Sequence, residues 1–139
     1  MKYHVIAHGG TTDDFEKGLK KSLRLAMDGE SKELLIKVCQ LANTRGIMSN
    51  VMGEKLINQL IKSRQISIKT PECTIHIFLE TKRANHSNFT TGTVFAPWLT
   101  LPSLEETMND FRTVNSVYVP WQEKELEDYI AVNPTSTAI

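Results

Sequence analysis

The residues best placed to do chemistry follow the first apolar run of the chain, in the segment His8-Gly9-Gly10-Thr11-Thr12. Glycine amides can approach a bound group closely, and threonine hydroxyls can donate hydrogen bonds to it. A helix that begins here would add free N–H groups and a partial positive charge. This combination favours a phosphate or another anion as ligand. His8 ends the apolar run, where its imidazole could act as a general acid or base, or could simply be hydrogen-bonded at a strand end.

The same segment is also typical of a purely structural corner. It matches neither the GxGxxG nor the GxxxxGK[ST] pattern of phosphate-binding loops. Asp13 and Asp14 place two carboxylates at the start of the next helix. Carboxylates suit the capping of a helix and would repel a bound anion. The glycine pair therefore keeps two interpretations, an anion site and a tight turn.

Further candidates should meet at the same edge, because ligands of open α/β sheets bind beyond the carboxyl ends of the strands. Glu80 ends an apolar run and could activate water or bind a ribose hydroxyl, unless it forms a solvated charge cluster with Lys82-Arg83. Arg45 lies in a loop and could bind a phosphate, although loop arginines are common. Trp98 and Trp121 each follow a proline that ends a predicted strand. Their rings could stack on a ligand, or else cover the core or a subunit interface.

The sequence predicts no metal centre and no cofactor. Cys39 and Cys73 lie in separate apolar runs without CxxC spacing, which is typical of buried reduced thiols. The histidines come from distant segments without the spacing of metal ligands. No GxSxG, HExxH or kinase signature occurs. The sequence therefore leaves open whether the chain is an enzyme.

The elements that must position these residues alternate between strands and helices. Short apolar runs predict strands at 3–7, 33–38, 66–68, 74–79, 93–96 and 116–119. Apolar residues at helical spacing predict helices from a cap at 11–13 to a stop at 28–29, from 49 to 63, from about 103, and from 123 to 130. Pro71 interrupts any single strand between 66 and 79, so a hairpin is expected there.

This order predicts a single α/β domain over residues 1–139, with 131–139 as a frayed tail. We expect a Rossmann-like, three-layer domain with a mainly parallel sheet, helices on both faces and one β-hairpin at about residues 66–79.

Charge is balanced overall but not along the chain. Sixteen Lys and Arg residues match sixteen Asp and Glu residues, so the net charge does not favour a nucleic-acid partner. Residues 101–139 hold seven acidic and two basic residues, and residues 1–100 carry the compensating positive charge. This asymmetry could favour self-association, or could reflect ordinary differences between helix surfaces. No apolar stretch approaches the roughly 20 residues of a membrane helix and no signal peptide is recognisable, so we expect a cytoplasmic protein without a membrane partner.

Two functional hypotheses follow from the sequence. The first is a small domain that binds a phosphate-bearing or nucleotide-like molecule at Gly9-Gly10, with Glu80, Arg45 and the tryptophans around it and His8 as the candidate acid or base. The second is a non-catalytic module that makes protein–protein contacts, including contacts with its own copies, through its charge-polarised surface and its tryptophans.

Overall fold

The computed structural model describes residues 1–7, 10–84 and 86–139. The strands are β1 (Lys2–His4), β2 (Glu33–Val38), β3 (Gln65–Lys69), β4 (Thr74–Thr81), β5 (Gly92–Pro97), β6 (Thr113–Val119) and β7 (Thr137–Ala138). The helices are α1 (Thr12–Asp28), α2 (Ile47–Met52), α3 (Glu54–Ser63), α4 (Leu101–Asn109) and α5 (Glu123–Val132), with a 3-10 turn at Leu41–Thr44. No helix in these ranges is long and apolar enough to cross a membrane.

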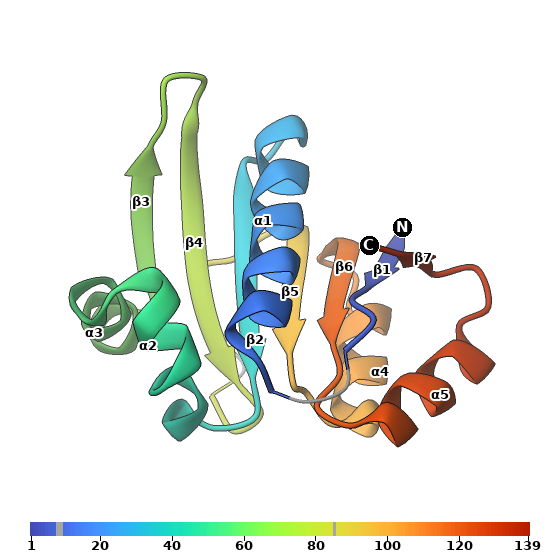
Figure 1. The fold of residues 1–139 in the computed structure, drawn as a ribbon. Coiled ribbons are helices and arrows are strands. Elements are labelled where there is room, and N and C mark those ends of the chain that lie inside the picture. Colours follow the sequence, from blue (N-terminus) through green and yellow to red (C-terminus); the bar gives the residue numbers. More distant parts are fainter. Residues whose placement is uncertain (8–9, 85) are drawn as a thin grey trace.

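The strands form one seven-stranded sheet in the order β3-β4-β2-β5-β6-β1-β7 (Figure 1). Only β3 pairs antiparallel, with β4, in the part of the sheet that the structure describes, and the other pairings are parallel. The predicted α/β class, the mainly parallel sheet and the hairpin around Pro71 are therefore confirmed.

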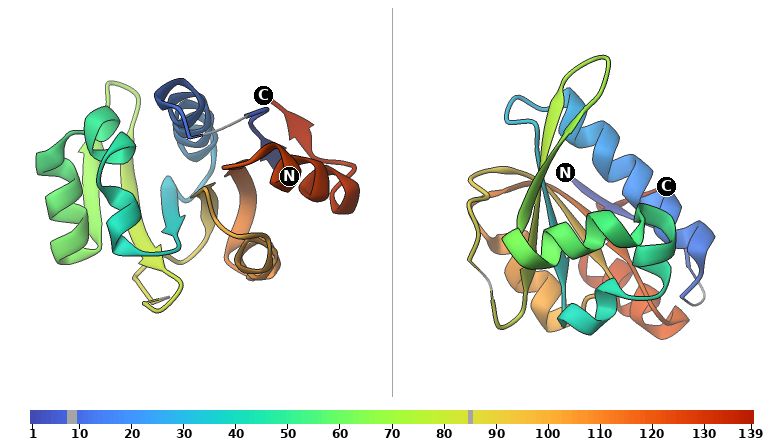
Figure 2. Two further views of the ribbon diagram at one scale, coloured as in Figure 1. Left: turned by 60° about the horizontal axis from the view of Figure 1, so that its bottom comes forward. Right: turned by 90° about the vertical axis from the view of Figure 1, so that its left-hand side faces the viewer.

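Helices α1 and α4 lie on opposite faces of this sheet (Figure 2). Phe95 of β5 packs against Phe15 of α1, with ring centroids 5.4 Å apart. The next residue of the strand, Ala96, packs in a separate cluster with Leu104 of α4. Successive side chains of a strand point to opposite faces, so this alternation sets the place of each helix. Further along the α4 face, Phe89 of the loop before β5 fills a third apolar cluster.

The segment predicted as one helix from 49 to 63 is two helices. Gly53 separates α2 from α3 with φ 93° and ψ 137°, a conformation far from helical. Its own N–H still donates to the carbonyl of Ser49, so α2 ends in a closed turn. The apolar spacing of Met52, Leu56 and Leu60 continues through the break, which is why periodicity alone could not detect it.

The end of the chain differs from the frayed tail expected at 131–139. Helix α5 continues to Val132, and β7 then pairs parallel with β1. Ser136 Oγ lies 2.8 Å from His4 Nδ1, and the N–H of Ile139 donates to the His4 carbonyl at 3.0 Å. His4 is thus a hydrogen-bonded sheet histidine, and the tail forms an edge of the sheet.

Gly92 allows β5 to start close against β2. Its φ is 151°, and a Cβ there would lie 2.5 Å from the carbonyl oxygen of Glu33. We expect Gly92→Ala to lower the free energy of unfolding by about 3 kcal/mol. The variant adds backbone strain at this φ and a steric clash between the new Cβ and the Glu33 carbonyl oxygen. Gly46 also has a positive φ, 77°, but its Cβ would meet nothing within 4 Å. Gly46→Ala should lower the free energy of unfolding by about 1 kcal/mol, measured by urea denaturation. An equal loss of stability in Gly92→Ala and Gly46→Ala would contradict a close approach of Gly92 to the Glu33 carbonyl.

Candidate functional site

A cavity of about 900 Å³ lies at the edge of the sheet where β2, β4 and β5 end. It is lined by the last residue of β4, by residues that follow the three strands and by the residue between α3 and β3: Cys39, Gln40, Leu41, Arg64, Thr81, Lys82, Arg83, Ala84 and Thr100. Segments far apart in the sequence meet here because parallel strands end at a common edge. Ligands of open α/β sheets bind at this edge, so the cavity is the candidate site.

Arg64 contributes a buried cationic nitrogen to the cavity. It ends α3 in the left-handed conformation, with φ 63° and ψ 5°. Its N–H donates to the Leu60 carbonyl at 2.8 Å and its own carbonyl accepts from Leu79 N at 3.0 Å, so its backbone is fixed on both sides. The side-chain Nη1 is buried and has no hydrogen-bond partner among the described residues. A buried donor without an acceptor costs free energy, and an acceptor on a bound ligand would remove this cost.

The other charged residues of the lining are also cationic. Lys82 and Arg83 follow β4 and are exposed. They form the tip of a tight turn, because Thr81 N donates to the Ala84 carbonyl and Ala84 N donates to Thr81 Oγ1, both at 3.0 Å. None of the described residues of the lining carries a carboxylate. Three cations without an acidic residue favour an anionic ligand.

Glu80, predicted as a catalytic carboxylate, lies in a buried ion cluster. Its side chain is fully buried. Arg112 donates to both carboxylate oxygens at 2.8 and 3.0 Å, Lys37 Nζ donates at 3.2 Å and Ser87 Oγ at 2.6 Å. Burial raises the pKa of Glu80. The hydrogen bonds from Arg112 and Ser87 and the positive charges of Lys37 and Arg112 lower the pKa. These four effects together are larger than the effect of burial, so the pKa lies below its ordinary value of 4.5. Both oxygens are occupied, which favours an ion-pairing role over general-base catalysis.

The ion cluster also holds the loop before β5 against the sheet. Arg112 lies over the Phe89 ring, 5.3 Å from its centroid, and Nη1 contacts the Phe89 carbonyl at 3.4 Å. Asp110 accepts from Nη2 of the same guanidinium at 2.8 Å. The loop that begins with the cationic turn of the cavity is therefore anchored at its far end by Glu80, through Ser87 and Arg112.

The lowered pKa of Glu80 predicts a pH dependence of stability. The folded state releases this proton more readily than the unfolded state, so the contribution of Glu80 is complete above pH 4.5 and is lost as the pH falls through the folded pKa. We expect the free energy of unfolding of the unmodified protein to fall more steeply between pH 5 and pH 3 than that of Glu80→Gln. Urea denaturation across this range measures both slopes, and parallel slopes would show that Glu80 does not contribute.

The first strand–helix turn is described from Gly10 onward, so the candidates His8 and Gly9 lie outside the described residues. Thr11 caps α1, since its Oγ1 accepts from Asp14 N at 3.1 Å and its carbonyl accepts from Phe15 N at 3.2 Å. Thr12 is exposed in the first turn of the helix. Two amides that could bind a phosphate are thus already used by Thr11.

The tryptophans pack on one another beside this turn. Trp98 stacks on Phe15 with ring centroids 5.5 Å apart and meets Trp121 edge-on at 5.4 Å. Trp121 lies so close to Gly10 that a Cβ at this position would overlap the indole ring. Trp98 has φ 59°, and its Nε1 is buried without a hydrogen-bond partner among the described residues. The structure therefore brings Gly10, Trp98 and Trp121 together, mainly through packing.

Arg45 does not contribute to the cavity. Its Nη1 donates to Asn58 Oδ1 of α3 at 2.9 Å, and its side chain is exposed. Arg64, which does line the cavity, was missed by the sequence analysis because a basic residue at the end of a helix usually faces solvent. Its only sequence signal is its place between a helical pattern and the first strand of the hairpin.

Comparison with models of protein families, with curated protein sequences and with solved structures gives no match to this chain.

Proposed function

We propose that this domain binds a small molecule with a phosphate or carboxylate group in the cavity at the ends of β2, β4 and β5. The observation that carries the proposal is the buried Nη1 of Arg64, which has no partner in the described part of the chain. Lys82 and Arg83 add positive charge at the mouth of the same cavity. A guanidinium with two neighbouring cations can bind a doubly charged oxyanion by direct hydrogen bonds and by long-range attraction.

The ligand class is that of the first sequence-based hypothesis, but the contact residues differ. We assign the anionic group to Arg64, Lys82 and Arg83 rather than to Gly10 and Thr11. The Thr11 cap uses amides at the start of α1, and Asp13 and Asp14 lie in the first turn of this helix. The proposal is one of binding and gives no reaction.

The finer fold assignment is part of the same proposal. We infer a Rossmann-like, three-layer domain, which is supported by α1 and α4 on opposite faces of the sheet and by a cavity at the carboxyl edge. A cytoplasmic location stays a prediction from the sequence.

Removing the Arg64 guanidinium should weaken anion binding strongly. Arg64→Asn keeps a residue type that tolerates the left-handed conformation at this position. We expect it to raise the Kd for pyrophosphate about 10- to 100-fold, the effect of losing charged hydrogen bonds of about 1.5–3 kcal/mol. Isothermal titration calorimetry at fixed ionic strength measures this change.

Lys62→Gln is the matched control for this variant. Lys62 is an exposed cation in the last turn of α3 and does not line the cavity. It should leave the Kd for pyrophosphate within about twofold, because exposed charges are screened. If Arg64→Asn and Lys62→Gln weakened pyrophosphate binding equally, the change in net charge alone would explain the effect. This result would contradict a binding site at Arg64.

Self-association through exposed apolar side chains is the second candidate function. Phe111 is 94% exposed and Val114, three residues further, is 58% exposed. Single exposed apolar residues are common, but a contiguous apolar patch is typical of an interaction surface. If this surface joins two copies, sedimentation velocity should show dimers that Phe111→Asn converts to monomers. A monomer at high concentration in the unmodified protein would contradict this candidate.

A further inference from the structure

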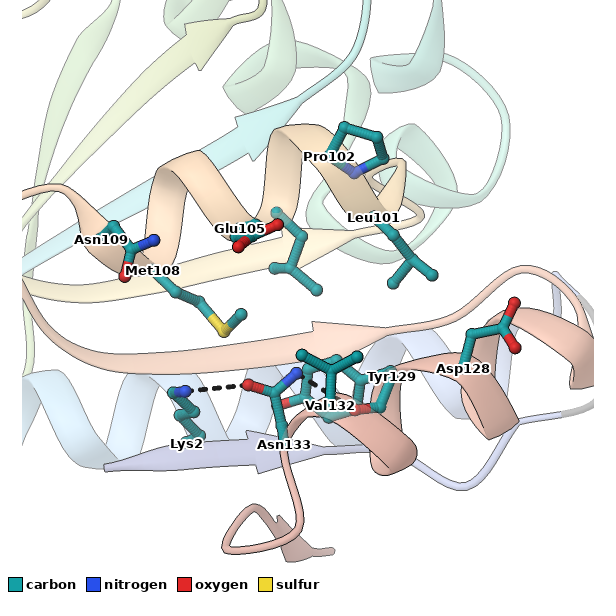
Figure 3. Close-up of a pocket in the computed structure, with 11 residues that line it drawn as sticks. Lys2, Leu101, Pro102, Glu105, Met108, Asn109, Asp128, Tyr129, Val132 and Asn133 are labelled. Atoms are coloured by element: carbon teal, nitrogen blue, oxygen red, sulfur yellow. Dashed lines mark hydrogen bonds between the residues drawn. The ribbon is translucent and has the colours of Figure 1, made fainter.

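A second cavity, of about 330 Å³, lies between α4 and α5 on the face of the sheet opposite α1 (Figure 3). Six of its eleven described lining residues are apolar or aromatic: Leu101, Pro102, Leu104 and Met108 come from α4, and Tyr129 and Val132 come from α5. Val132 is 74% exposed although it borders this cavity. Covering this exposed apolar surface with an apolar group would lower the free energy, because the surface is removed from water.

One end of the groove holds a positioned ammonium group. Lys2 Nζ donates to Asn133 Oδ1 at 2.8 Å. Asn133 is 7% exposed, and its Nδ2 donates to the Tyr129 carbonyl at 3.1 Å, which turns the amide oxygen toward Lys2 (Figure 3). An ammonium group has three donors, and Asn133 uses one of them. No acidic side chain forms an ion pair with Lys2 within the described ranges.

The acidic residues of the rim leave this end free for an anion. Asp128 lies at the opposite end of the groove from Lys2 (Figure 3) and is paired with Lys124 at 2.9 Å. Glu105 lies on α4, where its side chain is exposed to water. The groove thus combines a cation at one end with apolar side chains on both helices, among them Met108, Leu101 and Val132.

We propose that this groove binds an alkyl carboxylate, with its head group on Lys2 Nζ and its chain along Met108, Leu101 and Val132. The single positive charge of the ammonium matches the single negative charge of a carboxylate. The volume is at the lower end of small-molecule pockets, about 300 Å³, so the chain is of moderate length. This site shares no residue with the cavity at Arg64 and does not depend on the function proposed for it.

Titration with octanoate, followed by methyl and amide NMR signals of the full chain, tests this proposal. We expect saturable shifts at Met108 and Val132, and a rise in the Kd of about five- to tenfold in Lys2→Met. Lys20→Met is the control, because Lys20 is an exposed cation of α1 outside the groove. It should leave the Kd unchanged.

Octylamine and octanol distinguish the head group from the chain. Both should bind more weakly than octanoate, and Lys2→Met should remove the preference for octanoate over octanol. Equal binding of octylamine, an unchanged Kd in Lys2→Met, or shifts centred on Arg64 would each overturn the proposal. Shifts at Val132 that depend on protein concentration without octanoate would identify a second copy of the chain as the occupant and would also overturn it.

Discussion

Replacing Arg112 with methionine should lower the free energy of unfolding by about 3–5 kcal/mol, the usual effect of removing one partner from a buried ion pair. The variant would leave the fully buried Glu80 carboxylate with Lys37 as its only charged partner in the described cluster. It would also remove the guanidinium from Asp110 and from the Phe89 ring. Urea denaturation at pH 7 measures the loss, since this pH lies well above the lowered pKa of Glu80 in the unmodified protein.

Two further variants test whether the loss of stability depends on the burial of the ion pair. Arg24 forms an i,i+4 pair with Asp28 on the surface of α1, at 2.6 Å and with about half of each side chain exposed. Arg24→Met should change stability little, because exposed pairs are solvated and screened. The double variant Glu80→Gln/Arg112→Met should be more stable than Arg112→Met alone, because it removes the fully buried carboxylate that lost its main partner. Lys37 also loses its partner in the double variant, but its side chain keeps 12% exposure to water. A loss in Arg112→Met no larger than in Arg24→Met would contradict the described cluster.

Replacing Trp98 with alanine should lower the free energy of unfolding by about 2–4 kcal/mol. The indole stacks on the fully buried Phe15 and supports Trp121 from the side, so the variant would open a cavity above the start of α1. Alanine is as strained as tryptophan at φ 59°, so relief of backbone strain does not offset the loss. Thermal and urea denaturation should both report the change.

Trp98→Phe tests whether packing, rather than the indole nitrogen, carries this effect. Phenylalanine keeps most of the ring and removes an N–H group that is buried without a partner in the described part of the structure. Removing an unpaired buried donor is favourable and offsets part of the packing lost with the smaller ring, so this variant should stay within about 1 kcal/mol of the unmodified protein. A loss as large as that of Trp98→Ala would mean that the N–H has an acceptor and that the packing account is wrong.

The sequence predicted those elements whose residues carry a strong local signal. The apolar run at 33–38 indicated a strand, and β2 forms there, between β4 and β5 in the sheet. Pro71 marked the hairpin of β3 and β4 correctly. The sequence did not reveal the break at Gly53, because the apolar periodicity continues through it. It did not reveal strand β7 either, because two residues are too few to produce a pattern.

The candidate site was less predictable, because it depends on register and strand order. Glu80 is paired with Lys37, 43 residues before it, and with Arg112, 32 residues after it. The pairing of β2 with β4 places Lys37 directly beside Glu80, and a single sequence does not reveal this register. Arg64 reaches the cavity only because β3 pairs with β4 at the edge of the sheet. The carboxyl edge as the place for a ligand could be predicted, but the residues that line the cavity could not.

The central claim is that an anion binds beside Arg64, and the most direct measurement is an NMR titration with pyrophosphate at constant ionic strength. We predict saturable shifts of the Arg64 Nε–H signal and of the amides at 39–41, 81–84 and 100, the segments that line the cavity. Exposed cations such as Lys17 and Lys20 of α1 should show no saturable shifts. Shifts confined to the amides of Thr11 and Thr12, or spread over the lysines of α1 without saturation, would contradict the assignment of the site.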